Sequence, residues 1–178
     1  MRSLISLALP LIAAATPALA ADPVSGTVAP SGSVAGRCLF TTPQETIVLG
    51  ELAQAGSGAT AGKLDATRVN GQTTNLVGWC NNVGSSMAVT ATELSSTTSA
   101  PGASFDNRID YTASASANGV SASDSSVTAG TGGSTSVNVF AGSIGVTLSG
   151  ASTPNNGVLV AGSYTGNVTV TLSPNVVL

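Results

Sequence analysis

The chain has 178 residues, a formal net charge of −3, 7% charged residues and 3% aromatic residues. Its five lysines and arginines form no basic stripe, which argues against nucleic acid and against an anionic membrane surface as partners. Alanine, serine, threonine, glycine and valine dominate, and this mixture suits short strands and tight turns better than long amphipathic helices. We therefore expect an all-β fold.

Residues 1–20 have the pattern of a secretory signal peptide. Arg2 is followed by an apolar run from Leu4 to Ala15, and the small residues Ala18 and Ala20 precede the expected cleavage site. The run is shorter than the roughly 20 apolar residues that span a bilayer, and no later segment approaches that length. We expect an exported mature chain with one domain and no membrane insertion.

Residues 21–37 have the small-residue composition of a flexible tail. From residue 24 onward, however, the even positions carry only valine, glycine or proline: Val24, Gly26, Val28, Pro30, Gly32, Val34 and Gly36. A tail has no need of this period of two, which indicates a β-strand with one apolar face.

The two cysteines, Cys38 and Cys80, are expected to form a disulfide in an exported chain. The alternative is a reactive or metal-binding pair, for which the chain offers no histidine and no acidic cluster nearby. The lack of histidine also removes Ser-His-Asp and Cys-His catalysis. We expect no enzyme activity, no cofactor and no metal site, with a secreted enzyme as the remaining alternative.

Short strands are expected further along the chain, separated by clusters of serine, threonine, glycine and asparagine. The segments are 46–52, 73–80, 86–94, 104–116, 136–140, 143–148 and 158–172. Residues 118–136 are expected to be a long exposed loop or a weak hairpin. This spacing favours a sandwich of two antiparallel sheets.

Two groups of residues within these strands have a structural interpretation. Asp106, Arg108 and Asp110 alternate along one strand, which favours ion pairing on a solvated face over the paired carboxylates of a glycosidase. Trp79, next to Cys80, is expected in the core.

The order of these segments resembles bacterial fimbrial subunits of the chaperone-usher type. The resemblance rests on the alternating N-terminal arm, Cys38, "TIVLGEL", a second cysteine in "LVGWC" and the closing strand "AGSYTGNVTVTL". It implies an immunoglobulin-like β-sandwich (a pilin fold) that lacks its last strand. A periplasmic chaperone fills the resulting groove temporarily, and the N-terminal arm of the next subunit then replaces it by donor-strand exchange.

The resemblance also implies roles for residues of this chain. Residues 21–37 would be the donor-strand extension, and residues 38–178 the pilin domain with a disulfide between its first two strands. The donor side chains would be Val24, Val28 and Val34, with Gly26 or Gly32 where no bulk is tolerated. The acceptor groove and first chaperone contact would be formed by Tyr164, Val168, Val170 and Leu172.

The implied function is a structural subunit of a surface fimbria that polymerises head-to-tail and supports cell adhesion. Its partners would be other copies of itself, a periplasmic chaperone and an outer-membrane usher, and it would pass through the periplasm to the cell surface. Two alternatives remain: a spore-coat-U-like secreted protein that forms a coat or archaic pilus, and a fimbrial tip adhesin. The sequence departs from the family at Pro30, which removes a strand hydrogen-bond donor, and in its tail after Leu172.

Overall fold

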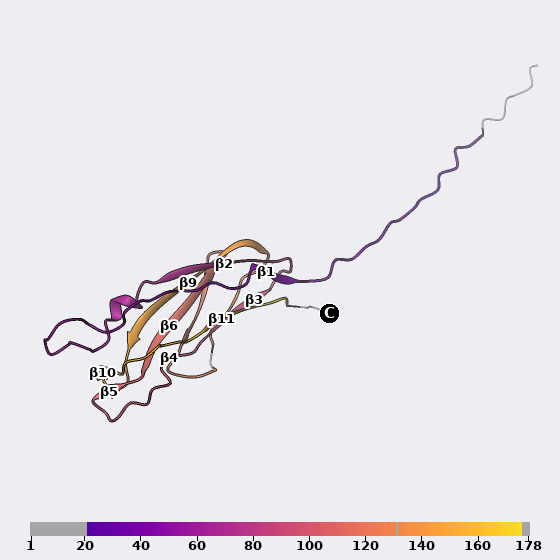
Figure 1. Ribbon diagram of the computed structural model, residues 1–178. Coiled ribbons are helices and arrows are strands. Elements are labelled where there is room, and N and C mark those ends of the chain that lie inside the picture. The colour runs from indigo at the N-terminus through magenta and orange to yellow at the C-terminus, as the bar shows by residue number, and fades with distance from the viewer. Residues whose placement is uncertain (1–20, 131, 176–178) are drawn as a thin grey trace, which may run out of the picture. The chain divides into compact units, whose positions relative to one another are not determined.

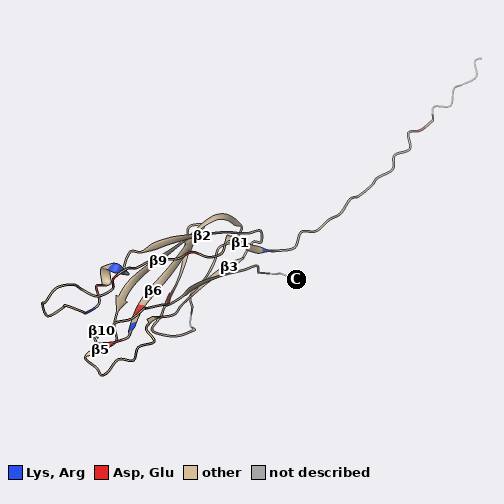
Figure 2. Ribbon diagram, viewed as in Figure 1, with Lys and Arg blue, Asp and Glu red and all other residues tan. Residues whose placement is uncertain are grey.

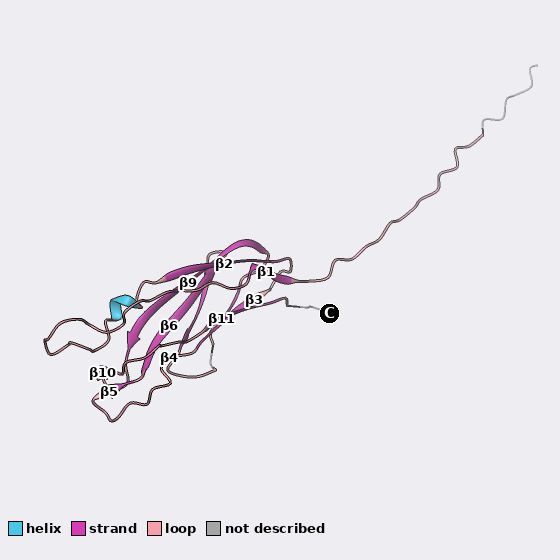
Figure 3. Ribbon diagram, in the orientation of Figure 1, coloured by secondary structure: helices cyan, strands magenta, loops and turns pink. Residues whose placement is uncertain are grey.

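A computed structural model describes residues 21–130 and 132–175, and the expected signal peptide lies outside this part of the chain. The described residues form an all-β structure whose single helical element is a short 3-10 turn, η1 (Ala66–Arg68) (Figure 3). None of its helices is long and apolar enough to cross a membrane. The chain divides into two compact units between Ser33 and Val34, whereas the sequence predicts a boundary after residue 37.

The first unit contributes residues 21–33 to the described structure, and we call them the arm. The arm is extended and forms no regular secondary structure. Its valines are almost fully exposed, at 98% for Val24 and 90% for Val28. The apolar alternation predicted from the sequence is therefore present in the arm without a partner strand among the described residues.

The second unit is built around a large antiparallel sheet (Figure 1). Its strands, in spatial order, are β1 (Cys38–Thr42), β2 (Thr73–Cys80), β9 (Phe140–Ser152), β6 (Arg108–Ala117) and β4 (Leu94–Ser95). A further strand, β7 (Val120–Ser125), pairs with β6 through a tight hairpin. Asn118 (φ 49°) and Gly119 (φ 78°) form the turn, where positive φ angles suit asparagine and glycine.

A second antiparallel sheet contains three strands and ends in β11. Its order is β11 (Val168–Ser173), β3 (Ser86–Ala91) and β8 (Ser134–Ser136). A short parallel pair, β5 (Phe105–Asp106) with β10 (Val158–Leu159), lies apart from both sheets.

The two sheets share one hydrophobic core. Met87 and Val89 of β3 are fully buried, as are Ile109 of β6 and Ile144 of β9. On β6 the inward positions are mostly alanines, which let the opposing strands approach closely. An all-β architecture with two sheets around a common core is thus confirmed.

The strand predictions have mixed outcomes. The segment 73–80 is confirmed as β2, and 143–148 lies within the longer β9. Residues 46–52 form no strand: Ile47, Leu49 and Leu52 pack on the core, but Gly50 has a φ of 71° and the chain there pairs with neither sheet. The period of two in this segment therefore reflects side chains that are alternately buried and exposed, although the segment pairs with no strand.

The remaining predicted segments are also broken or shifted. The segment 158–172 divides into β10 and β11, and 86–94 and 104–116 each divide in two. Residues 137–139 lie outside the strands, although 136–140 is predicted as one strand. No hairpin forms within 118–136, which is expected to be a loop or a weak hairpin: β7 there pairs with the preceding β6, and β8 pairs with β3.

The predicted disulfide between Cys38 and Cys80 is confirmed. The two residues are directly opposite each other in the β1–β2 pair, with a Cα–Cα distance of 4.1 Å. The bond fastens the start of β1 to the end of β2 and leaves no free cysteine in the described chain.

We predict that replacing Cys38 and Cys80 together by alanine lowers the free energy of unfolding by about 4 kcal/mol, because the bond closes a loop with a sequence separation of 42. Urea unfolding followed by circular dichroism measures this difference. An unchanged midpoint would show that the loop is constrained without the bond. Reduction of the native chain should reproduce the effect of the double substitution.

Candidate strand-binding edge

β11 is paired along one edge only. Its partner is β3, with Val170 opposite Val89 and Leu172 opposite Met87. The pairing continues beyond the strand: Thr92 donates its N–H to the Asn167 carbonyl at 2.8 Å, and Thr165 and Ser95 exchange backbone bonds of 2.9 and 3.1 Å. The region 165–173 is therefore held on one side over almost its whole length.

The alternation of an extended strand determines which backbone N–H and C=O groups of this region face away from β3. Because Thr165 and Asn167 turn their backbone groups toward the paired side, so do the other odd-numbered residues, and the even-numbered residues turn theirs away. No segment of the described residues pairs with this second edge. Such an edge is a template for another strand.

The side chains of the four residues predicted to line an acceptor groove also share this alternation. Val170 belongs to the core and is 9% exposed, while Tyr164, Val168 and Leu172 are partly buried and pack against it. The threonines between them are exposed. The structure thus brings the four residues together along one open edge, with apolar side chains that are only partly covered.

Tyr164 is fixed by a polar contact with β5. Its hydroxyl lies 2.9 Å from the Val160 carbonyl oxygen and 3.1 Å from that of Asp106. Burial raises the pKa of this phenol. The contact holds residues 160–164 close to the sandwich although they form no strand.

The carboxylate of Asp106 has a structural role in the same region. It is 2% exposed and accepts hydrogen bonds from the Asn155 N–H (3.2 Å), the Asn155 Nδ2 (2.9 Å) and the Gly157 N–H (2.6 Å). These bonds fix the loop that leads into β10. Asp106 therefore positions the chain that carries Tyr164.

The predicted ion pairing of Arg108 is confirmed for Asp110, but Asp106 takes no part in it and the two carboxylates are buried instead of solvated. Asp110 is 5% exposed and takes both bonds from Arg108, Nε to Oδ1 and Nη2 to Oδ2, at 3.0 Å each. Asp106 instead bonds to Asn155 and Gly157, because Asn107 interrupts the strand between β5 and β6. The ionic contact is a bidentate pair with a buried carboxylate, which also raises the pKa of Arg108.

Two glycines allow the close approaches that shape the edge. A Cβ at Gly166 would lie 2.6 Å from the carbonyl oxygen of Glu93, the residue before β4, so the chain passes there at a distance that no side chain permits. A Cβ at Gly78 of β2 would lie 2.9 Å from the Leu39 carbonyl oxygen and 3.2 Å from Leu172 Cδ1. Gly78 therefore provides the space in which Leu172 packs.

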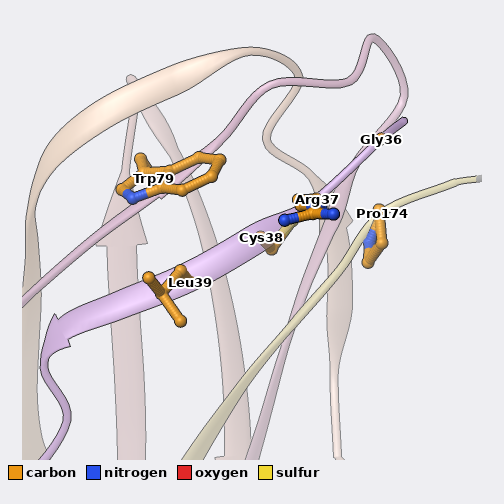
Figure 4. A pocket seen from close by; sticks show the side chains of 6 residues that line it. All are labelled: Gly36, Arg37, Cys38, Leu39, Trp79 and Pro174. Carbon is orange, nitrogen blue, oxygen red and sulfur yellow. The ribbon is translucent and has the colours of Figure 1, made fainter. Parts of the chain in front are cut away.

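β1 is the neighbouring unpaired edge, and a shallow hollow of about 330 Å³ lies at its start (Figure 4). The hollow is lined by Gly36, Arg37, Cys38, Leu39, Trp79 and Pro174. Pro174 directly follows β11, so the hollow lies where the open edge of β11 ends.

The prediction that Trp79 lies in the core is wrong. Trp79 is half-buried, pairs with Leu39 across β1 and β2, and lines the hollow. Sequence reasoning missed this hollow, although a signal for it was present. Cys80 is buried, and the residue before it on the same strand must face the other way.

Charged groups are sparse around the edge (Figure 2). Within the described residues, no group of three histidine, cysteine, aspartate or glutamate side chains could hold a metal ion. The two ion pairs of the described residues join Arg68 to Asp65 and Arg108 to Asp110. The chemistry that this region offers is backbone hydrogen bonding and apolar contact.

Comparison with known proteins gives no relative: no family model, no curated protein and no solved structure matches the chain. The interpretation of the edge therefore depends on its own geometry.

The buried phenol of Tyr111 contacts the chain just before β11. Its side chain is 3% exposed, and its hydroxyl lies 3.3 Å from the Asn167 carbonyl oxygen. Burial, with a smaller contribution from Glu93, raises its pKa from 10.0 to about 12.

We predict that the contribution of Tyr111 to the free energy of unfolding is constant up to about pH 10 and declines between there and pH 12, because the unfolded chain loses the Tyr111 proton first. The chain has two tyrosines, so the Tyr164→Phe variant leaves Tyr111 as the only phenol to titrate. Absorbance at alkaline pH should give a midpoint near 12. A midpoint near 10 with the sheets intact would contradict the burial of Tyr111.

Proposed function

We propose that the chain is a structural subunit of a surface fimbria and polymerises head-to-tail by donor-strand complementation. The arm of one copy lies along the open edge of β11 in the next. The observation that carries this proposal is that one chain has both an unpaired edge at one end of its sequence and an unpartnered strand-like arm at the other. Each part supplies what the other lacks.

The strand order supports an immunoglobulin-like sandwich that lacks one strand. Such a sandwich has strands A, B, E and D in one sheet and C, F and G in the other. The order β1-β2-β9-β6 corresponds to A-B-E-D, and β3 and β11 correspond to C and F in both sequence order and pairing. Strand G would pair with β11 along the edge that is open here.

The side chains of the arm suit this position. Val24 and Val28 of the arm and Val34, which directly follows it, share one parity and are 98%, 90% and 88% exposed, so each has most of its surface left to bury. Burial of three valines stabilises the contact by roughly 5 to 6 kcal/mol before the ladder hydrogen bonds are counted. Backbone pairing and apolar burial together are the interactions of strand addition to a sheet edge.

Head-to-tail contact explains the filament. Each copy donates its arm and accepts another at a different surface, so the association is heterologous and extends without closing. A subunit waiting to assemble exposes the same edge, which makes a periplasmic chaperone and an outer-membrane usher its partners during export to the cell surface.

We predict that Val28→Asp abolishes polymerisation and that Thr27→Asp preserves it. The first substitution places a charge among the apolar positions of the arm, whereas the second places the same charge on the opposite, solvent-facing side. The measurement is the ladder of multimers that resists mild detergent, with electron microscopy of the filaments.

Because the arm lies outside the folded unit, both variants should have the unfolding curve of the native chain. A chain without residues 21–33 should behave like Val28→Asp. A ladder that survives both changes would refute donor-strand polymerisation.

A further inference from the structure

Arg37 lines the hollow with a backbone that is held in place and a guanidinium that forms no ion pair among the described residues. Its backbone is held by Asn81: the Arg37 N–H donates to Asn81 Oδ1 at 2.6 Å, and the Asn81 N–H donates to the Arg37 carbonyl at 3.0 Å. The guanidinium is in neither of the ion pairs found in the described residues. Figure 4 shows it beside Pro174, on the side of β1 where the open edge of β11 ends.

Pro30 limits the registers in which the arm can bind along β11. In an antiparallel pair, opposite residues that exchange two hydrogen bonds alternate with opposite residues that exchange none. The even-numbered residues of β11 turn their backbone groups to the open edge, so the inward-facing residues of the arm would be the ones that bond to them. Pro30 has this parity and has no N–H to donate. It must therefore lie beyond β11, whose first residue is Val168.

One antiparallel register satisfies this condition and also matches side-chain sizes. It places Val24, Gly26 and Val28 opposite Leu172, Val170 and Val168, respectively. Pro30 then lies opposite Gly166, Gly32 opposite Tyr164, and Val34 opposite Gly162. At four of these six pairs a glycine lies opposite a larger residue, and the glycines of the arm leave room for Val170 and Tyr164.

The same register carries the start of the arm into the hollow. Two residues before Val24, Asp22 lies opposite Pro174, which lines the hollow together with Arg37. Asp22 is the only charged residue of the arm. An unpaired cation and an unpaired anion thus meet at the end of the strand.

On the basis of the proposed function, we propose that the hollow beside Trp79 receives the first residues of a neighbouring copy's arm, with the Asp22 carboxylate paired to Arg37. The pair fixes the direction and register of an otherwise uncharged strand. A parallel arm would place Pro30, and no charge, next to Pro174.

The test is a charge exchange in the full chain. We compare the native chain with Arg37→Asp, Asp22→Arg and the double variant, and measure how fast the detergent-resistant ladder dissociates. Each single variant should dissociate roughly two- to fivefold faster, and the double variant should return to the native rate. Lys63→Asp, which changes the net charge as much as Arg37→Asp does, should have no effect. The differences should vanish in about 1 M salt.

The outcomes separate this inference from the proposed function. If the native chain forms a ladder but the single variants behave like Lys63→Asp, or if the double variant is no better than either, the ion pair is refuted and donor-strand polymerisation stands. If the native chain forms no ladder, both fail.

Cysteine cross-linking tests the direction independently. Val24→Cys combined with Leu172→Cys should form a disulfide between copies, because opposite residues of an antiparallel pair have Cα atoms about 5.5 Å apart. Val24→Cys combined with Val168→Cys is the matched pair for a parallel arm and should stay reduced. Cross-linking of the second pair alone would overturn the register and the placement of Asp22.

Discussion

The second unit depends on a backbone constraint at β11. Hydrogen bonds to β3 and β4 use one edge of residues 165–173, and the even-numbered residues turn their N–H and C=O groups to the other side. The same residues turn their side chains toward the core. A strand that is apolar on one face and unpaired on one edge is a template to which a further strand can add. The described residues of the second unit supply none.

The surrounding structure holds this edge in place. The buried carboxylate of Asp106 fixes the loop before β10, and the Asp106 carbonyl lies within reach of the Tyr164 hydroxyl. At the other end, the disulfide ties β1 to β2, and Gly78 leaves space for Leu172. The open edge of β11 therefore has fixed ends. Fixed ends are needed if an added strand is to bind in a single register.

Much of the fold follows from local sequence patterns, and the failures have physical reasons. β2 and the disulfide could be predicted because alternation and cysteine chemistry are local. The segment 46–52 could not, because a period of two reports alternating burial and says nothing about a hydrogen-bonded partner. Trp79 was misplaced because the buried face was inferred from residue type instead of from the parity of Cys80. The bonds of Asp106 join it to residues about fifty positions away, which no local pattern reveals.

The scarcity of charge gives the few charged groups a large influence on specificity. An arm of small and apolar residues can slide by two positions along an apolar edge and keep its alternation, so burial alone selects the register weakly. Glycine opposite a large residue restricts the slide, and proline restricts it further because it tolerates no strand partner at its nitrogen. In the proposed complex, a single charge at the start of the arm would then distinguish the two directions. In a chain with 7% charged residues, few other groups are available to do so.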